Sequence, residues 1–260
     1  MKRALIGFGT PLGSYLAQRF DFAASYTYKQ AFSRIEPCDE AICICPAGKL
    51  LGGTSLAPQG YQLAAKLKQA AGRIVLLSSI DVYPAKGVPF DEYSLPFGSH
   101  RKAWLETFEQ EILSRGPEAN ILRLPEIFGL PGVRPAFTCE PAKINRVAIH
   151  QWYPAHRLVR DIAIAQASQA AVVNLVSEPL PMASVLKQFF PGQIGKVATP
   201  APYSRIRTRF AALYGESASY IMSAQAVLED IGRALGAAKS TKAAYSMALA
   251  NGPALAAACG

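Results

Sequence analysis

Short apolar runs alternate with segments of helical periodicity along the first half of this 260-residue chain, and this alternation constrains the fold most strongly. The predicted strands are residues 4–9, 23–28, 41–46, 73–79, 120–129 and 171–176. Helices are predicted between them, most clearly at 61–71 and 104–113. Strands separated by helices are joined by right-handed crossovers, so the pattern predicts an α/β fold: a parallel sheet with helices on both faces.

The pattern loosens after residue 130, which predicts a second, smaller part. Three helices there are expected to begin at polar N-caps, which are Asp161, Ser184 and Ser223. We expect residues 1–130, with part of 157–180, to form the core, 131–237 a C-terminal lobe on the substrate side, and 238–260 a mobile tail.

Composition indicates a globular chain without a membrane segment. Half of the residues are hydrophobic and 17% are charged, so a sizeable core can be buried. No apolar run reaches the roughly 18 residues of a membrane span, and the start leads into Gln18 and Arg19 without a cleavage-like site. We therefore expect a cytoplasmic protein. The five cysteines and three histidines lack metal-ligand spacing, so no metal site is predicted.

The net charge of +9 is concentrated in the second half of the chain. Residues 1–140 carry 15 basic and 13 acidic side chains, whereas residues 141–260 carry 12 and 5. The basic residues do not cluster with aromatic ones, which argues against nucleic acid as a partner. They suit a small anionic substrate, and a solvated basic surface is the alternative. The sequence leaves undecided whether the chain forms a homodimer.

A glycine-rich turn joins the first predicted strand to the first predicted helix. Gly7 would allow the tight turn, Gly9 the approach of a pyrophosphate to the backbone, and Gly13 close packing of helix on strand. This context is typical of a Rossmann-type dinucleotide-binding fold, although a turn that serves packing alone is the alternative. The predicted cofactor contacts of the turn are Gly7, Gly9, Thr10, Pro11, Leu12 and Gly13.

The residues after the second predicted strand favour NADP over NAD. A carboxylate in this region would bind the ribose 2′-hydroxyl of NAD, but the segment has no acid and carries Lys29 and Arg34, which suit a 2′-phosphate. Only residues 29–40 separate this strand from the next, too few for a further strand and helix. The adenine side of the predicted pocket therefore looks trimmed.

Later motifs resemble those of a known enzyme family. Residues 76–84, LLSSIDVYP, are similar to the family motif SSxxVYG, and residues 122–129, LRLPEIFG, to R-x-x-N-x-Y-G. Asp91 and Glu92 precede the segment 96–101 as acidic residues do in that family. The first 180 or so residues thus resemble extended short-chain dehydrogenase/reductases acting on nucleotide-sugars. Residues 151–165, QWYPAHRLVRDIAIA, and 172–180, VVNLVSEPL, also look like a sub-branch described as sugar-nucleotide-binding or NAD-dependent epimerase/dehydratase-like.

The resemblance implies a Ser, Tyr and Lys at the active site, and two of the three differ here. Ser79 matches the serine, whereas Phe97 stands at the tyrosine position and Arg101 at the lysine position. Phenylalanine cannot transfer a proton and arginine is not deprotonated, so the standard mechanism cannot run unchanged. Arg101 is expected to bind ribose or phosphate oxygens of the cofactor.

Four side chains are candidates to replace the missing acid. His100 is favoured because it lies near position 97 and titrates near neutrality. Glu126, at a substrate-contacting position of the family, and Tyr83 and Tyr93 are the others; for each the alternative is a structural role.

Two functions follow. The favoured one is an NAD(P)-dependent oxidoreductase or epimerase-like enzyme on a nucleotide-sugar or similar anionic carbonyl compound, with catalytic candidates Ser79, His100 and Glu126. The alternative is a nucleotide or nucleotide-sugar binding protein without turnover. A non-redox enzyme using Glu126 and His100 is a weaker third possibility.

Overall fold

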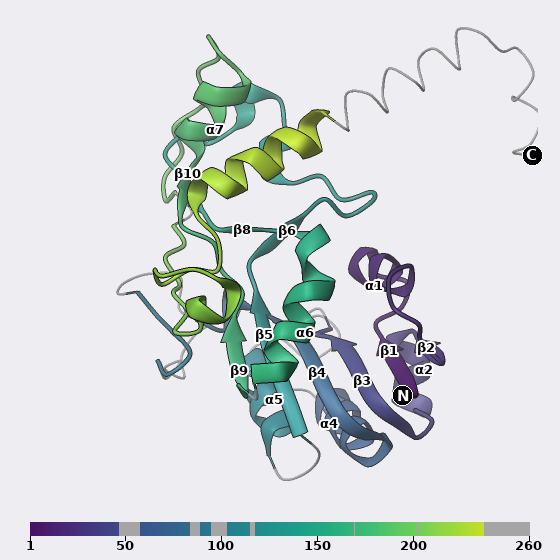
Figure 1. Cartoon of the computed structure of the whole chain (residues 1–260). Coiled ribbons are helices and arrows are strands. Elements are labelled where there is room, and N and C mark those ends of the chain that lie inside the picture. The colour runs from purple at the N-terminus through teal and green to yellow at the C-terminus, as the bar shows by residue number, and fades with distance from the viewer. Residues whose placement is uncertain are drawn as a thin grey trace, which may run out of the picture.

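A six-stranded parallel sheet forms the centre of the protein (Figure 1). The computed structural model describes residues 1–46, 58–83, 89–94, 103–114, 118–168, 170–201 and 203–236. The strands of the sheet are β1 (Arg3–Ile6), β2 (Ala24–Tyr26), β3 (Cys38–Ile44), β4 (Ala71–Ser79), β5 (Glu118–Leu124) and β9 (Val172–Asn174). Their order is β2-β1-β3-β4-β5-β9, and every neighbouring pair is parallel. The predicted Rossmann-type α/β fold is confirmed.

Helices cover both faces of the sheet. One face carries α1 (Pro11–Ala17) and α6 (Leu158–Ser168), and the other carries α2 (Tyr28–Ser33), α4 (Pro58–Ala70) and α5 (Ala103–Leu113). Because successive strand residues point to opposite faces, Leu5 and Ile42 enter one hydrophobic cluster while Ile6 and Cys43 enter the other.

The chain reverses direction across the sheet between β1 and β3. From β1 it proceeds outward to β2 on one side, and from β3 it proceeds through β4 to β5 and β9 on the other. Residues 1–46 contain no further strand between α2 and β3, since α2 ends at Ser33 and β3 begins at Cys38. The short 29–40 segment therefore leaves β2 at the edge of the sheet, consistent with the trimmed adenine side that the sequence indicates.

The rest of the described chain forms a lobe beyond the carboxyl ends of the strands (Figure 1). Its strands are β6 (Glu126–Phe128), which pairs with β8 (Trp152–Pro154), and β7 (Ile149–His150), which pairs with β10 (Leu180–Pro181). The helix α7 (Met182–Phe189) and a helix over residues 224–236 complete the lobe. Short 3-10 helices are η1 (Ile80–Val82), η2 (Ala136–Thr138), η3 (Pro141–Lys143), η4 (Ala155–Arg157) and η5 (Ala211–Tyr214).

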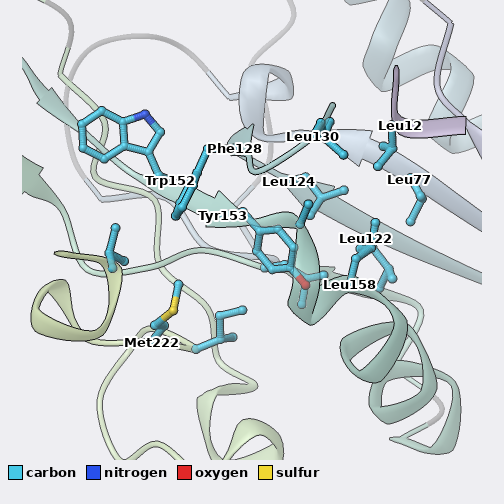
Figure 2. Packing of buried hydrophobic residues seen from close by; sticks show 14 of the residues in the cluster. Leu12, Leu77, Leu122, Leu124, Phe128, Leu130, Trp152, Tyr153, Leu158 and Met222 are labelled. Atoms are coloured by element: carbon cyan, nitrogen blue, oxygen red, sulfur yellow. The ribbon is translucent and has the colours of Figure 1, made fainter. Parts of the chain in front are cut away.

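One hydrophobic cluster runs from the sheet into this lobe. Figure 2 shows Leu12 of α1 and Leu77 of β4 on one side of it, with Trp152 and Met222 of the lobe on the other. All of these side chains are buried. The lobe is therefore packed directly on the α1 and α6 face of the sheet. No helix in the described ranges is long and apolar enough to cross a membrane.

Two of the three predicted helix caps are wrong. Helix α6 begins at Leu158, after η4, so Asp161 lies within its first turn, fully buried, where it accepts hydrogen bonds from Tyr153 Oη (2.8 Å) and Arg160 Nε (2.9 Å). Burial with these donors outweighs a local preference for the capping position.

Helix α7 likewise begins earlier than predicted, at Met182, because Pro181 occupies the N-cap position and Ser184 falls inside the helix. Ser223 does cap the helix over 224–236, since its Oγ accepts from the backbone N–H of Ala226 at 3.2 Å. The predicted tail, 238–260, lies outside the described residues.

Candidate cofactor-binding site

The glycine turn is held tightly against the end of β2. Gly7 and Gly9 have φ values of +99° and +90°, which L side chains rarely adopt. The N–H groups of Gly7 and Phe8 both donate to the carbonyl of Tyr26, at 2.9 and 3.0 Å. Thr10 caps α1, because its Oγ1 accepts from Gly13 N at 3.0 Å while donating to Gly7 O at 2.8 Å.

The three glycines have different surroundings. A Cβ on Gly13 would lie 2.3 Å from the carbonyl oxygen of Gly7, so glycine is required for the close approach of α1 to β1. Among the described residues, a Cβ on Gly9 would meet only Thr27 Cγ2, at 3.9 Å, so these residues leave this part of the backbone open. Gly13 thus serves packing, while Gly9 leaves a surface that a ligand can approach. Leu12 contributes its side chain to the core.

Tyr28, the first residue of α2, lies across the carboxyl end of β1. Its hydroxyl donates to the carbonyl oxygen of Ile44 at the end of β3, at 3.2 Å. A Cβ on Gly7 would lie 2.9 Å from Tyr28 Oη and 3.2 Å from Cζ. Burial raises the pKa of the Tyr28 phenol well above its usual value. Sequence reasoning missed this residue, since nothing local marks a tyrosine that contacts positions 7 and 44.

Lys29 and Arg34 lie in one hollow on the outer side of α2. The hollow has a volume of about 690 Å³. Its lining residues are Tyr26, Thr27, Lys29, Gln30, Ser33, Arg34 and Glu36. Thr27 lines the hollow, and its Cγ2 lies 3.9 Å from the position that a Cβ on Gly9 would take, so the hollow adjoins the glycine turn. Arg34 Nε pairs with Glu36 Oε1 at 2.8 Å, both side chains being well exposed, so part of the positive charge is offset.

Ser79 ends β4 beside Leu124 of β5. Its Oγ accepts from the backbone N–H of Asp81 at 3.1 Å and so caps η1. Because a hydroxyl has one proton to donate as well as lone pairs, accepting from Asp81 does not use the Ser79 proton.

Tyr83 belongs to a buried polar network. Its hydroxyl accepts from Arg123 Nη1 at 2.6 Å and donates to the carbonyl of Asp91 at 2.9 Å, while Arg123 Nη2 pairs with Glu109 Oε2 at 2.6 Å. Burial raises the pKa of Tyr83 to about 12, against the opposing effect of Arg123. Tyr83 is thus a structural residue. Tyr93 is 70% exposed, with the Arg209 guanidinium 4.8 Å from its ring centroid.

Glu126 lies two residues beyond Leu124 in a polar cluster. Its Oε2 accepts from Trp152 Nε1 at 3.2 Å and its Oε1 from the backbone N–H of Ala136 at 3.3 Å. His150 Nδ1 is 4.0 Å from Glu126 Oε2, and the His150 ring stacks on Trp152 with 5.0 Å between centroids. Burial lowers the pKa of His150, and Glu126 partly opposes that shift.

Sequence reasoning did not single out His150, since no ligand motif surrounds it and the contact arises from the pairing of β6 with β8. The predicted site residues Phe97, His100 and Arg101 lie outside the described residues. Within the described ranges, no group of three or more His, Cys, Asp or Glu side chains is placed to hold a metal ion.

The described geometry can be compared with known proteins. No protein-family model matches the sequence, and no curated protein matches it. Solved structures do match: a dTDP-4-dehydrorhamnose reductase from Bacillus anthracis in complex with NADP has a TM-score of 0.66 at 15% identity, covering 90% of this chain and 99% of that one. The chain therefore shares the fold of this reductase.

Two further structures carry the same architecture. A short-chain dehydrogenase/reductase superfamily protein from Agrobacterium tumefaciens with bound NAD has a TM-score of 0.64 at 14% identity, covering 93% of this chain and 100% of that one. A UDP-N-acetylglucosamine 4-epimerase from Bacillus cereus has a TM-score of 0.60 at 16% identity, covering 88% and 98%. The resemblance stated from the motifs is thus confirmed for the fold, while the reaction of this chain is a separate question.

Proposed function

We propose that this chain binds a nicotinamide dinucleotide and acts as an NAD(P)-dependent oxidoreductase or epimerase-like protein on a nucleotide-sugar or similar anionic carbonyl compound. The observation that carries the proposal is the glycine turn at the reversal of the strand order, with an open backbone at Gly9. Structures of the same fold hold NAD or NADP, and two have names that specify nucleotide-sugar substrates.

In this proposal the pyrophosphate lies along residues 9–13. Pro11 has no N–H and the N–H of Gly13 is engaged by Thr10, so Leu12 offers the N–H at the start of α1. The backbone of Gly9 allows close approach, because the Thr27 methyl group is all that the described part of the chain places within 4 Å of its Cβ position.

Lys29 and Arg34 support a preference for NADP. Both side chains line the hollow that Thr27 joins to the glycine turn, and the 2′-phosphate of NADP would bring a second anion to that hollow. Among the described residues that line the hollow, Glu36 carries the one carboxylate, and it is paired with Arg34.

The proposed chemistry differs from the family mechanism. The nicotinamide, when bound, exchanges a hydride with the substrate carbon. Ser79 would donate its hydroxyl proton, which the contact with Asp81 does not use, as a hydrogen bond to the substrate oxygen. The proton itself would come from His100 or Glu126, because Phe97 has none to give. Arg101 would hold ribose or phosphate oxygens.

A nucleotide-binding protein without turnover is the second candidate. The observation that favours it is the missing strand between α2 and β3 within residues 1–46, together with the Tyr28 ring at the end of β1. Both would weaken the binding of a dinucleotide cofactor, without which no hydride transfer takes place.

Calorimetry with NADPH and NADH tests the proposal. We expect tighter binding of NADPH, and a selective loss of NADPH affinity in the variant Lys29→Gln/Arg34→Gln. Lys143→Gln is the matched control, because Lys143 is an exposed lysine paired with Glu140 on the lobe. Equal or tighter binding of NADH would overturn the preference for NADP, and no binding of either would overturn the proposed function.

Turnover is measured separately. Cofactor oxidation against a panel of nucleotide-sugars and keto compounds distinguishes an enzyme from a binding protein, and inactivity with retained tight nucleotide binding would favour the second candidate. If an active substrate is found, an unchanged pH profile in His100→Gln would exclude His100 as the proton donor.

A further inference from the structure

The carboxyl ends of β1 and β3 define where a ligand of this sheet is expected. Open parallel sheets bind ligands outside the carboxyl ends of their strands, at the point where the strand order reverses. Here that point lies between β1 and β3, since β2 is on one side of them and β4 on the other. The adjoining backbone residues are Gly7, which follows β1, and Ile44, which ends β3.

The Tyr28 side chain occupies this point. It comes from α2, directly after β2, and crosses the end of β1 to reach β3, where its hydroxyl donates to Ile44 O. The hydroxyl and Cζ atoms lie so close to Gly7 that a Cβ there would be 2.9 and 3.2 Å away. The ring therefore occupies space between the two strand ends.

The position of Tyr28 is fixed by local structure. Thr27 and Gln30 form a capping box, in which the Thr27 side chain accepts from Gln30 N and the Gln30 side chain from Thr27 N. This reciprocal bonding sets the direction in which the first residue of α2 leaves β2. Within residues 1–46 no strand lies between α2 and β3, so the start of α2 lies beside β1 and Tyr28 can reach Ile44.

We infer that Tyr28 closes the adenosine half of the dinucleotide site and is the residue that sets how strongly adenine dinucleotides bind. The inference rests on the proposed function. An adenosine group reaches the space between β1 and β3 only when the Tyr28 ring leaves Ile44 and Gly7. The free energy of the contacts that the ring loses lowers the affinity of the protein for the dinucleotide. A nicotinamide mononucleotide has no adenosine and binds without moving the ring.

The protonation state of the Tyr28 phenol indicates that ionisation does not displace the ring from its place between β1 and β3. Burial raises the pKa of Tyr28, with Cys43 and Cys45 adding to the shift. Burial also raises the pKa of both thiols, so these neighbours are neutral near pH 7. The ring therefore leaves only by breaking its hydrogen bond and packing contacts.

The test compares affinities for NADPH and reduced nicotinamide mononucleotide, by calorimetry, in wild type, Tyr28→Ala and Tyr28→Phe. We expect Tyr28→Ala to bind NADPH at least about tenfold more tightly, because no ring has to move. Tyr28→Phe keeps the ring but loses one hydrogen bond, so we expect a gain of about threefold. Affinity for the mononucleotide should change less than about twofold in both. Tyr61→Ala removes a 45% exposed tyrosine on α4 and is the matched control.

Each outcome decides a different point. If wild type binds NADPH and Tyr28→Ala, shown to be folded by its thermal transition, binds it no more tightly, the inference is overturned and the proposed function stands. Equal gains for NADPH and the mononucleotide also overturn it. If Tyr28→Ala does not fold, Tyr28→Phe decides, and an unchanged NADPH affinity overturns the inference. If no variant binds either ligand, the proposed function fails and the inference fails with it.

Discussion

The carbonyl oxygen of Gly7 lies so close to Gly13 that a Cβ at position 13 would be 2.3 Å from it. The same oxygen accepts from Thr10 N at 3.2 Å and from Thr10 Oγ1 at 2.8 Å. One backbone carbonyl thus organises both the turn and the start of α1. Because a backbone atom and not a flexible side chain stands at this position, the structure cannot relax around a substitution at little cost.

Gly13→Ala should therefore destabilise the fold by about 1–3 kcal/mol, the usual cost of forcing a methyl group into a packed site. Urea unfolding followed by circular dichroism measures it. Gly236→Ala is the control, because no atom of the described residues lies within 4 Å of its Cβ position at the end of the helix over 224–236, and alanine favours helix. A Gly13→Ala protein as stable as wild type would contradict the described contact.

Gly9→Val should abolish NADPH binding, because its side chain would stand where the pyrophosphate approaches the turn. It should also cost about 1–2 kcal/mol of stability, since Gly9 has a φ of +90°. Gly132→Val separates the two effects: Gly132 has a φ of +76° and nothing within 4 Å of its Cβ position, so the strain is similar but the turn is intact. Retained binding in Gly9→Val would place the cofactor elsewhere.

Glu109→Gln should lower stability by about 3–5 kcal/mol, because it leaves the buried Arg123 guanidinium without its ion-pair partner. Glu140→Gln removes an exposed pair with Lys143 and should cost at most about 1 kcal/mol. Urea midpoints of the two variants measure the difference. Similar losses in both would show that the Arg123 charge is solvated in the folded protein.

The pKa of His150 should lie below 6.5, since burial disfavours its charged form. The unfolded chain then takes up the proton first, so the His150 contribution to stability is full above pH 6.5 and is lost as pH falls below that value. Glu126→Gln should lower the pKa further, because the Glu126 charge raises it. Titration of the imidazole proton resonances, assigned with His150→Gln, measures both. A pKa above 6.5 in wild type would contradict the described burial.

The sequence alone determined the sheet and its covering helices, since each depends on a local pattern. Strand runs with apolar residues on both faces and helices with one apolar face can only bury those surfaces together as a layered parallel sheet. The glycine turn was also visible, because its residues act within a few positions of one another. The caps at Asp161 and Ser184 were predicted wrongly, since a cap contributes only about 0.5–2 kcal/mol and burial of Asp161 with Tyr153 and Arg160 outweighs it.

Only the tertiary structure decided what surrounds the candidate site. Tyr28 contacts Ile44 because β2 and β3 flank β1 in the sheet. The spacing of residues within either segment does not predict this strand order. His150 meets Glu126 because β8 pairs with β6, which brings together residues 24 positions apart. Such contacts depend on how distant segments pack, and packing is a property of the whole folded chain. Local sequence patterns therefore predict the elements, whereas the sheet arrangement selects which side chains face one another.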